Sequence, residues 1–166
     1  MPKKKSKKSA VSGGPYLTGA FFCEKALEET DRVPTFIRVM DILTIEEPKL
    51  PAQPLGQPEI MPAVLVTLVV MLKSGDEKGK RTLRIDTVTP SLKRRKGTDQ
   101  TISFSGGEGG VHLRGPVPHP VNEEGVYWHE VRLDGKLLTR IPLRVVYSPT
   151  KPDPQPLSTP GAKEKG

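Results

Sequence analysis

Residues 125–147, GVYWHEVRLDGKLLTRIPLRVVY, constrain the fold of this chain more than any other stretch. Polar and apolar residues alternate on both sides of Asp134-Gly135. An Asp-Gly pair between two alternating runs is a strong short-range signal for a β-hairpin. A proline-rich, polar stretch follows the second run. We therefore predict a hairpin that closes the folded part of the chain.

The loop of this hairpin decides which side chains face the core. A two-residue turn would pair Val131 with Leu138 and would oppose polar to apolar residues on each face. A three-residue loop over residues 133–135, with Gly135 as the bulge residue, pairs Val131 with Leu137 instead. The alternation therefore favours the three-residue loop.

This register gives three side chains a predicted orientation. His129 falls on the apolar face, where a neutral imidazole needs a hydrogen-bond partner, and Thr139 on the facing strand is the predicted one. Trp128 and Arg140 fall on the opposite face. There the guanidinium group of Arg140 is able to stack on the indole ring.

The composition favours an all-β chain. Eighteen prolines and sixteen glycines in 166 residues argue against a helical bundle. The apolar residues are mostly Val, Ile and Leu in short runs, as β-strands require. The single cysteine, Cys23, excludes an internal disulfide and a cysteine-based zinc site. Its place in an apolar run predicts a buried structural thiol.

The fold class that these patterns predict is a single antiparallel β-sandwich of seven or eight strands. It spans residues 16–148. Residues 1–15 are a basic tail and residues 149–166 a proline-rich tail, and both are expected to be disordered because they offer little to bury.

Three internal segments carry further expectations. Residues 63–72, AVLVTLVVML, are expected to form a central strand that ends at the polar residues 73–76. The glycines of residues 106–110 are expected to form a hairpin turn. Three prolines limit residues 111–121 to a short edge strand.

The net charge of +7 lies mostly outside the predicted domain. One positive charge comes from the residues after 148 and one from residues 9–148. The other five form a lysine tail that predicts a weak, salt-sensitive contact with nucleic acid or another anionic surface. These lysines are Lys3, Lys4, Lys5, Lys7 and Lys8.

The sequence predicts a cytoplasmic protein. The longest apolar run, residues 60–72, is too short to span a membrane, which takes about 20 residues. The basic start is followed by a Ser-Gly-Gly-Pro stretch rather than by the apolar segment of a secretion signal. We therefore expect neither a membrane span nor export.

Candidate binding residues lie on the outward face of the hairpin and on the loops. Trp128 and Arg140 share the outward face. Lys93, Arg94 and Arg95 make the loop of residues 91–98 basic, and residues 46–58 form a second, proline-rich loop. These surfaces predict a protein partner.

The three histidines raise an alternative, a metal-dependent enzyme. His112 and His129 would meet if their strands were neighbours, and Glu123 or Glu124 would complete a site. However, the histidines, His119 included, lack the close local spacing that is typical of metal sites. We therefore expect ordinary surface and half-buried histidines, with no metal and no other cofactor.

The two ends of the predicted domain resemble a family of small bacterial β-sandwich proteins of unknown function. The stretches concerned are AFFCEKALEETDRVPTFIRVMD at residues 20–41 and GVYWHEVRLDGKLLTRIPLRV at residues 125–145. In that family a Cys-Glu pair closes the first strand, and a Gly-x-Tyr-x-x-x-Val hairpin precedes a Pro-Leu-x-Val strand. The resemblance implies an immunoglobulin-like or C2-like sandwich and transfers no catalytic residue. The matching hairpin positions are Gly125, Tyr127, Val131, Asp134, Gly135, Pro142, Leu143 and Val145.

These features together predict a non-enzymatic binding or accessory module. The sequence contains no nucleophile elbow and no HExxH zinc motif, and its glycine-rich run lacks the lysine of a P-loop. Two alternatives stay open. One is the metal-dependent enzyme, and the other is a tether that the lysine tail holds on nucleic acid or on an acidic partner.

Overall fold

The computed structural model describes residues 13–31, 33–48 and 61–149. These residues form eight strands and no helix, so the all-β prediction is confirmed. Most of both predicted tails and of the proline-rich loop lies outside the described residues. The strands are β1 (Tyr16–Glu28), β2 (Pro34–Met40), β3 (Ile42–Glu46), β4 (Ala63–Val88), β5 (Arg94–Arg95), β6 (Gln100–Pro120), β7 (Gly125–Leu133) and β8 (Lys136–Ser148).

The strands belong to one mixed sheet. Its order is β2-β1-β4-β7-β8-β3, and β5 and β6 both pair with β4. Every pairing is antiparallel except that of β3, which runs parallel to β8. The expectation of a purely antiparallel structure is therefore wrong. Only Asp41 separates β2 from β3, so the chain crosses to the far edge of the sheet without room to reverse.

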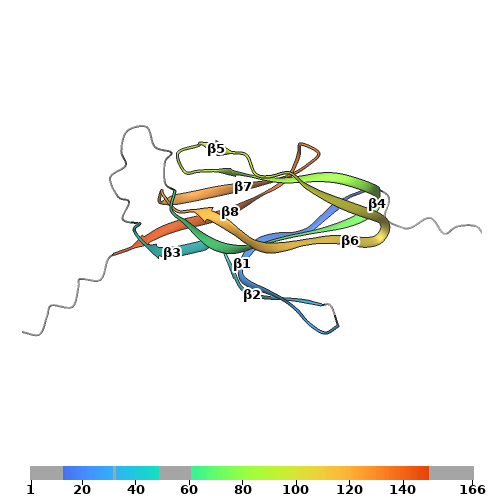
Figure 1. Ribbon diagram of the computed structural model, residues 1–166, viewed down its shortest axis with the longest axis horizontal. Helices are drawn as coiled ribbons and strands as arrows, with labels where there is room; N and C mark the ends of the chain where they lie inside the picture. Colours follow the sequence, from blue (N-terminus) through green and yellow to red (C-terminus); the bar gives the residue numbers. More distant parts are fainter. Residues whose placement is uncertain (1–12, 32, 49–60, 150–166) are drawn as a thin grey trace, which may run out of the picture.

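The sheet is built around β4, which is 26 residues long. The first half of β4 pairs with β1 and its second half with β7, while β6 follows it along most of its length. The hairpin of β4 and β6 bends, so that β1 and β2 lie on the opposite side of the molecule from β5 and β7 (Figure 1). The buried core lies inside this bend. Its main cluster is Phe22, Val66, Leu68, Val70, Leu72, Leu83, Ile102, Phe104, Val131, Leu133, Ile141 and Leu143.

The bend occurs where the sequence predicted strand ends. Residues 73–76 and 106–110 lie inside β4 and β6, opposite one another, at the points where the register between the two strands shifts. Gly75, Gly106 and Gly107 have positive φ angles there. Glycine at positive φ kinks a paired strand as readily as it ends one. The predicted turn is therefore wrong, and the segment is a pair of bulges in a continuous hairpin.

β6 is also longer than its prolines predicted. Pro116, Pro118 and Pro120 all lie within the strand. In an extended strand, residues two apart turn their backbone nitrogens toward the same side. Among the described strands β6 pairs with β4 alone, so the three missing donors can all lie on its free edge, where the ladder loses no hydrogen bond.

β7 and β8 form the predicted hairpin with a different turn. Leu133 pairs with Lys136 across Asp134 and Gly135. The two turn residues have φ angles of 47° and 80°, the left-handed pair that an Asp-Gly turn adopts. The predicted three-residue loop is wrong, and the tight turn forms.

A tight turn alone would place polar residues opposite apolar ones on each face of the hairpin. A bulge in β8 removes this mismatch. Arg132 pairs with Leu137, but Val131 pairs with Thr139, so Leu138 is an extra residue in β8. Beyond it the two strands present the faces that the alternation predicts. At the bulge itself the prediction fails, because Leu137 is 36% exposed and Leu138 packs against the core instead.

Two further core predictions concern single residues. Cys23 is a free, fully buried thiol, as predicted, and burial raises its pKa. Tyr127 is also fully buried. Its hydroxyl group donates a hydrogen bond to the carbonyl oxygen of Glu123 at 3.0 Å and accepts one from the Glu123 amide at 3.1 Å.

Replacing Gly135 by alanine is expected to lower the free energy of unfolding by about 1 kcal/mol, because a side chain disfavours the left-handed backbone. A Cβ atom there would contact nothing within 4 Å, so the cost is one of backbone conformation alone. Gly115 lies in β6, has equally open surroundings and needs no positive φ. Gly115→Ala should therefore be neutral or slightly stabilising. Urea unfolding of both variants tests the turn, and equal effects would contradict it.

Candidate functional site

Two buried carboxylates lie at the centre of the outward face of β4 and β7. Asp86 and Glu130 are cross-strand partners. Their neighbours Ile85 and Val131 face the core, so alternation turns the two acids outward. Their side chains are nevertheless only 3% and 2% exposed. Arginine side chains from four strands cover them.

We call Arg84, Arg94, Arg132 and Arg140 the arginine face. Three of these residues bind Glu130, whose carboxylate accepts hydrogen bonds from Arg94 Nη1 at 2.5 Å, from Arg132 Nη2 at 2.7 Å and from Arg140 Nε at 3.2 Å. The hydrogen bond from Arg132, together with that from Arg94, lowers the pKa of Glu130 against the opposing effect of burial. Glu130 is thus an ionised anchor for the surrounding guanidinium groups.

Asp86 anchors the other side of the arginine face. Its Oδ1 accepts a hydrogen bond from Arg84 Nε at 2.9 Å and one from the Gly97 amide at 3.1 Å. Arg132 Nε lies 3.4 Å from Oδ2. The Gly97 contact also fixes the segment that follows β5 against β4.

The arginine face keeps an excess of positive charge. Its four guanidinium groups surround two buried carboxylates, and the exposed Asp99 lies 3.4 Å from Arg84, which leaves one positive charge. The side chains of Arg94 and Arg140 are 48% and 57% exposed. Each guanidinium has five N–H donors, more than the two acids use. The face is therefore an ordered, solvent-accessible set of donors suited to anionic groups.

Trp128 lies beside the arginine face on β7. It is 41% exposed and points outward, as the alternation predicts. Its partners across the sheet are Val88 and Pro142. Arg140 was predicted to stack on its indole ring, but Arg140 lies opposite Glu130 and binds that carboxylate. Trp128 and the arginine face together form the candidate binding surface.

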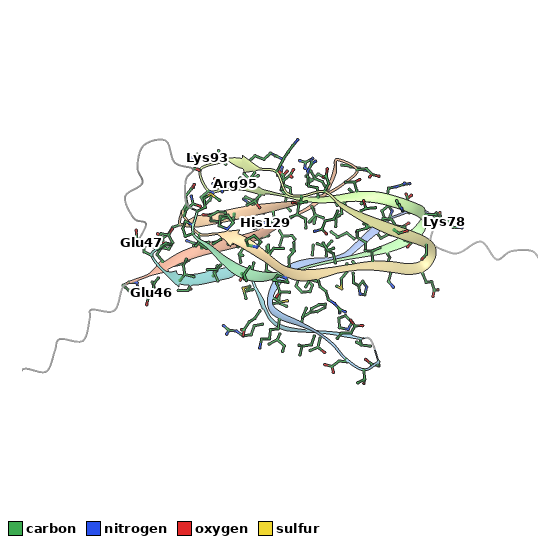
Figure 2. All side chains as sticks on the ribbon, viewed as in Figure 1. Glu46, Glu47, Lys78, Lys93, Arg95 and His129 are labelled. Carbon is green, nitrogen blue, oxygen red and sulfur yellow. The ribbon has the colours of Figure 1, made fainter. Side chains whose placement is uncertain are left out.

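The three basic residues of the predicted loop separate in the structure. Arg94 joins the arginine face, and Lys93 is exposed next to it. Arg95 pairs with Thr87, whose side chain contacts the buried His129, and its guanidinium group contacts the sulfur atom of Met61. Figure 2 shows Lys93 and Arg95 together at the end of the molecule far from Lys78.

His112 and His129 do not meet, as the alternative metal site would require. His112 is exposed on β6, whereas His129 is buried against His119. Seven residues of extended strand separate His112 from His119, which corresponds to about 20 Å. The parts of the chain that the structure describes contain no group of three or more His, Cys, Asp or Glu side chains able to hold a metal ion.

The two glutamates proposed for that site bind elsewhere. Glu123 accepts hydrogen bonds from the amide and the hydroxyl group of Ser91 at 2.9 and 3.0 Å. Glu124 accepts one from the Tyr147 amide at 2.5 Å. Glu123 therefore joins two loops, and Glu124 holds a loop to β8.

His119 and His129 instead form a buried pair that the sequence did not predict. Their exposures are 0% and 4%, and 3.1 Å separates His119 Nδ1 from His129 Nε2. His129 Nδ1 lies 3.2 Å from the Thr87 hydroxyl group, so Thr87 rather than Thr139 is its partner. The rings of Phe22 and Tyr127 enclose the pair, with ring centroids 4.7 Å from His129 and 4.8 Å from His119 respectively.

Both histidines of the pair are neutral at physiological pH. Desolvation lowers the pKa of His119 to about 4. Desolvation, with a further contribution from His119, lowers the pKa of His129 to about 3. His119 Nε2 has no hydrogen-bond partner among the described residues. The pair is a polar element within the core, and it carries no charge.

Comparisons with known proteins identify no family. No protein-family model matches the sequence, and no curated protein matches it. Among solved structures, the chain is similar to the alkylpurine DNA glycosylase AlkC of Pseudomonas fluorescens bound to DNA containing an abasic site analog, with 11% identity and a TM-score of 0.40. The match covers 64% of this chain and 27% of that one, so this chain spans about a quarter of the glycosylase.

A second similar structure is an immunoglobulin-like protein from Pseudomonas aeruginosa. The identity is 12%, the TM-score is 0.38, and the match covers 81% of this chain and 98% of that one. Within the described residues, no helix is long and apolar enough to cross a membrane.

Proposed function

We propose that this chain is a non-enzymatic binding module of a bacterial cytoplasm. In this proposal the domain is an immunoglobulin-like β-sandwich, and an acidic protein partner binds to the arginine face and Trp128. The single observation that carries the proposal is the ordered set of arginines, with excess positive charge, beside a half-exposed tryptophan.

Two features support the sandwich. The bent hairpin of β4 and β6 places β1 and β2 across the core from β5 and β7 (Figure 1). The hydroxyl group of the buried Tyr127 binds the backbone of Glu123, four residues upstream. This contact is similar to the tyrosine corner of immunoglobulin-like domains, where a tyrosine near the start of a strand binds upstream backbone.

The chemistry of the surface supports a protein partner. Tryptophan and arginine are the residues that most often carry the binding energy of protein interfaces. Glu130 and Asp86 hold the arginines in place before binding, which reduces the entropy that association has to offset. Carboxylates of a partner would form paired hydrogen bonds with the exposed guanidinium groups.

Replacing Trp128 by alanine is expected to weaken partner binding by about 2 kcal/mol, or roughly thirtyfold in Kd. The tagged chain would be used to capture partners from cells of its source, and the affinity of the captured protein would then be measured. Leu65→Ala is the matched control, because Leu65 is an exposed apolar residue in the first half of β4, 74% exposed. A partner that binds equally to the Trp128 and Leu65 variants contradicts the proposed surface.

Nuclease treatment of the same captured material separates the protein partner from the nucleic-acid tether. Retention that disappears after nuclease treatment and after deletion of residues 1–8 would assign binding to the lysine tail. Retention that survives both treatments and weakens when Arg140 is replaced by glutamate supports the arginine face. Arg140 is the most exposed arginine bound to Glu130, so this change tests the charge of the surface directly.

A further inference from the structure

A cavity of about 430 Å³ opens on the inner side of β5, separate from the arginine face. Its walls come from both halves of β4, from the last residues of β6 and from residues 95–100. Leu68, Leu83, Ile85 and Val117 line its interior. The volume falls in the range of about 300–1,000 Å³ that is usual for small-molecule sites.

The charge of the cavity has one sign. Arg95 and Lys96 are among its lining residues, and no aspartate or glutamate is. Within the described parts of the chain, the guanidinium group of Arg95 has the sulfur atom of Met61 as its hydrogen-bond partner and no carboxylate. A thioether sulfur is a weak acceptor. An anion at this position would therefore bind Arg95 without displacing a strong partner.

The interior of the cavity offers no free polar group of comparable strength. Thr87 and His129 line it, but they bind each other, and the second nitrogen of His129 binds His119. Figure 2 shows His129 in the interior and Arg95 toward the surface. The site therefore has an apolar end inside and a cationic end outside.

The rim that carries the cations is held in place. The Gly97 amide donates to Asp86, and a Cβ atom at Gly97 would collide with the carbonyl oxygen of Ile85. Arg95 itself pairs with Thr87 across β4 and β5. The cation therefore belongs to a fixed edge of the cavity.

We propose that this cavity binds a small amphiphile, an apolar chain or ring that bears one carboxylate. The apolar part lies against Leu83, Ile85 and Val117, and the carboxylate pairs with Arg95. The proposal does not depend on the arginine face, because it uses the opposite side of β5.

Calorimetric titration of the full chain with octanoate and with octanol tests this proposal. Octanoate should bind about tenfold more tightly than octanol, since its charged carboxylate forms a stronger, paired hydrogen bond with the guanidinium group than the neutral hydroxyl group does. Arg95→Gln should remove that difference and leave octanol binding unchanged. Val117→Trp should weaken binding of both molecules by occupying part of the cavity. Arg144→Gln, at an exposed arginine of β8, is the matched control and should change nothing.

The expected results are distinguishable from a failure to fold. Arg95 lies at the rim, so its variant should keep the unfolding midpoint of the parent chain. Chemical shifts of the Ile85 and Val117 methyl groups should move on titration with octanoate. Absence of octanoate binding to the folded parent chain would overturn the proposal. Equal binding of octanoate by the parent and the Arg95 variant would overturn it as well.

Discussion

Replacing Glu130 by alanine is expected to lower the free energy of unfolding by about 2–3 kcal/mol. The side chain of Glu130 is 2% exposed and binds Arg94, Arg132 and Arg140. Without this carboxylate, the three guanidinium groups lose their shared negative partner and repel one another. Breaking a fully buried ion pair costs about 3–5 kcal/mol, and the loss expected here is smaller because the exposed side chains of Arg94 and Arg140 can turn toward water.

A matched control removes a glutamate from an exposed ion pair. Glu24 lies 3.1 Å from Arg38, and the side chains of Arg38 and Glu24 are 80% and 45% exposed. Glu24→Ala should change the free energy of unfolding by about 0.5 kcal/mol or less, because water screens such pairs. Urea unfolding of both variants gives the comparison. Equal losses would show that Glu130 does not anchor the arginine face.

The Glu130 variant also links stability to binding. The same carboxylate orients three of the four arginines on the proposed surface. A chain that folds without it would present mobile guanidinium groups, and each would lose side-chain entropy on binding. The Glu130 variant should therefore bind the partner more weakly even in the absence of urea, where the variant is fully folded.

The inward and outward faces of the β7–β8 hairpin could be predicted from the sequence, and the turns, the bulges and the full lengths of β4 and β6 could not. Alternation placed Tyr127, Val131 and Leu143 inward and Trp128 outward, because the side-chain period of a strand is a local property. The turn at Asp134-Gly135 was predicted wrongly, since a bulge at Leu138 lets both the tight turn and the apolar face form. A bulge depends on how the strand packs against other strands, and this packing cannot be predicted from a single sequence.

The candidate site was also predicted only in part. Arg94, Arg140 and Trp128 were identified from charge and parity, and the structure places them around one surface. Asp86 and Glu130 were missed, although both stand at outward positions of alternating strands. Their meeting depends on the pairing of β4 with β7, which are far apart in the sequence. The alternation of β7 showed which of its side chains point outward, but it did not show that β4 lies beside β7.

The histidine pair was missed for a different reason. The alternation placed His129 inward, but the prolines around His119 predicted only a short edge strand, and no face was assigned to His119. In the structure the prolines occupy the free edge of β6 and His119 turns into the core. A proline prevents hydrogen bonding to a strand on the side toward which its nitrogen points. It does not determine whether the neighbouring side chain faces the core or the solvent.

Lowering the pH from 7.5 to 5.5 is expected to reduce the free energy of unfolding by about 2–3 kcal/mol, because the unfolded chain takes up protons that the folded chain excludes. The pKa values of His119 and His129 fall from 6.5 to about 4 and about 3 on folding. Both histidines thus favour the folded state fully above pH 6.5. That contribution is lost progressively as the pH falls from there toward the folded pKa values.

Urea unfolding at a series of pH values isolates the two histidines, since Glu130 acts in another range. The pKa of Glu130 is lowered on folding, so its contribution is lost only below its usual value of 4.5. His119→Gln should remove about half of the pH dependence between 7.5 and 5.5, and replacing His129 as well should remove the rest. His112→Gln is the matched control, because His112 is exposed and should leave the dependence intact. A pH dependence that persists without His119 and His129 would mean that the pair is not the acid-sensitive element of the core.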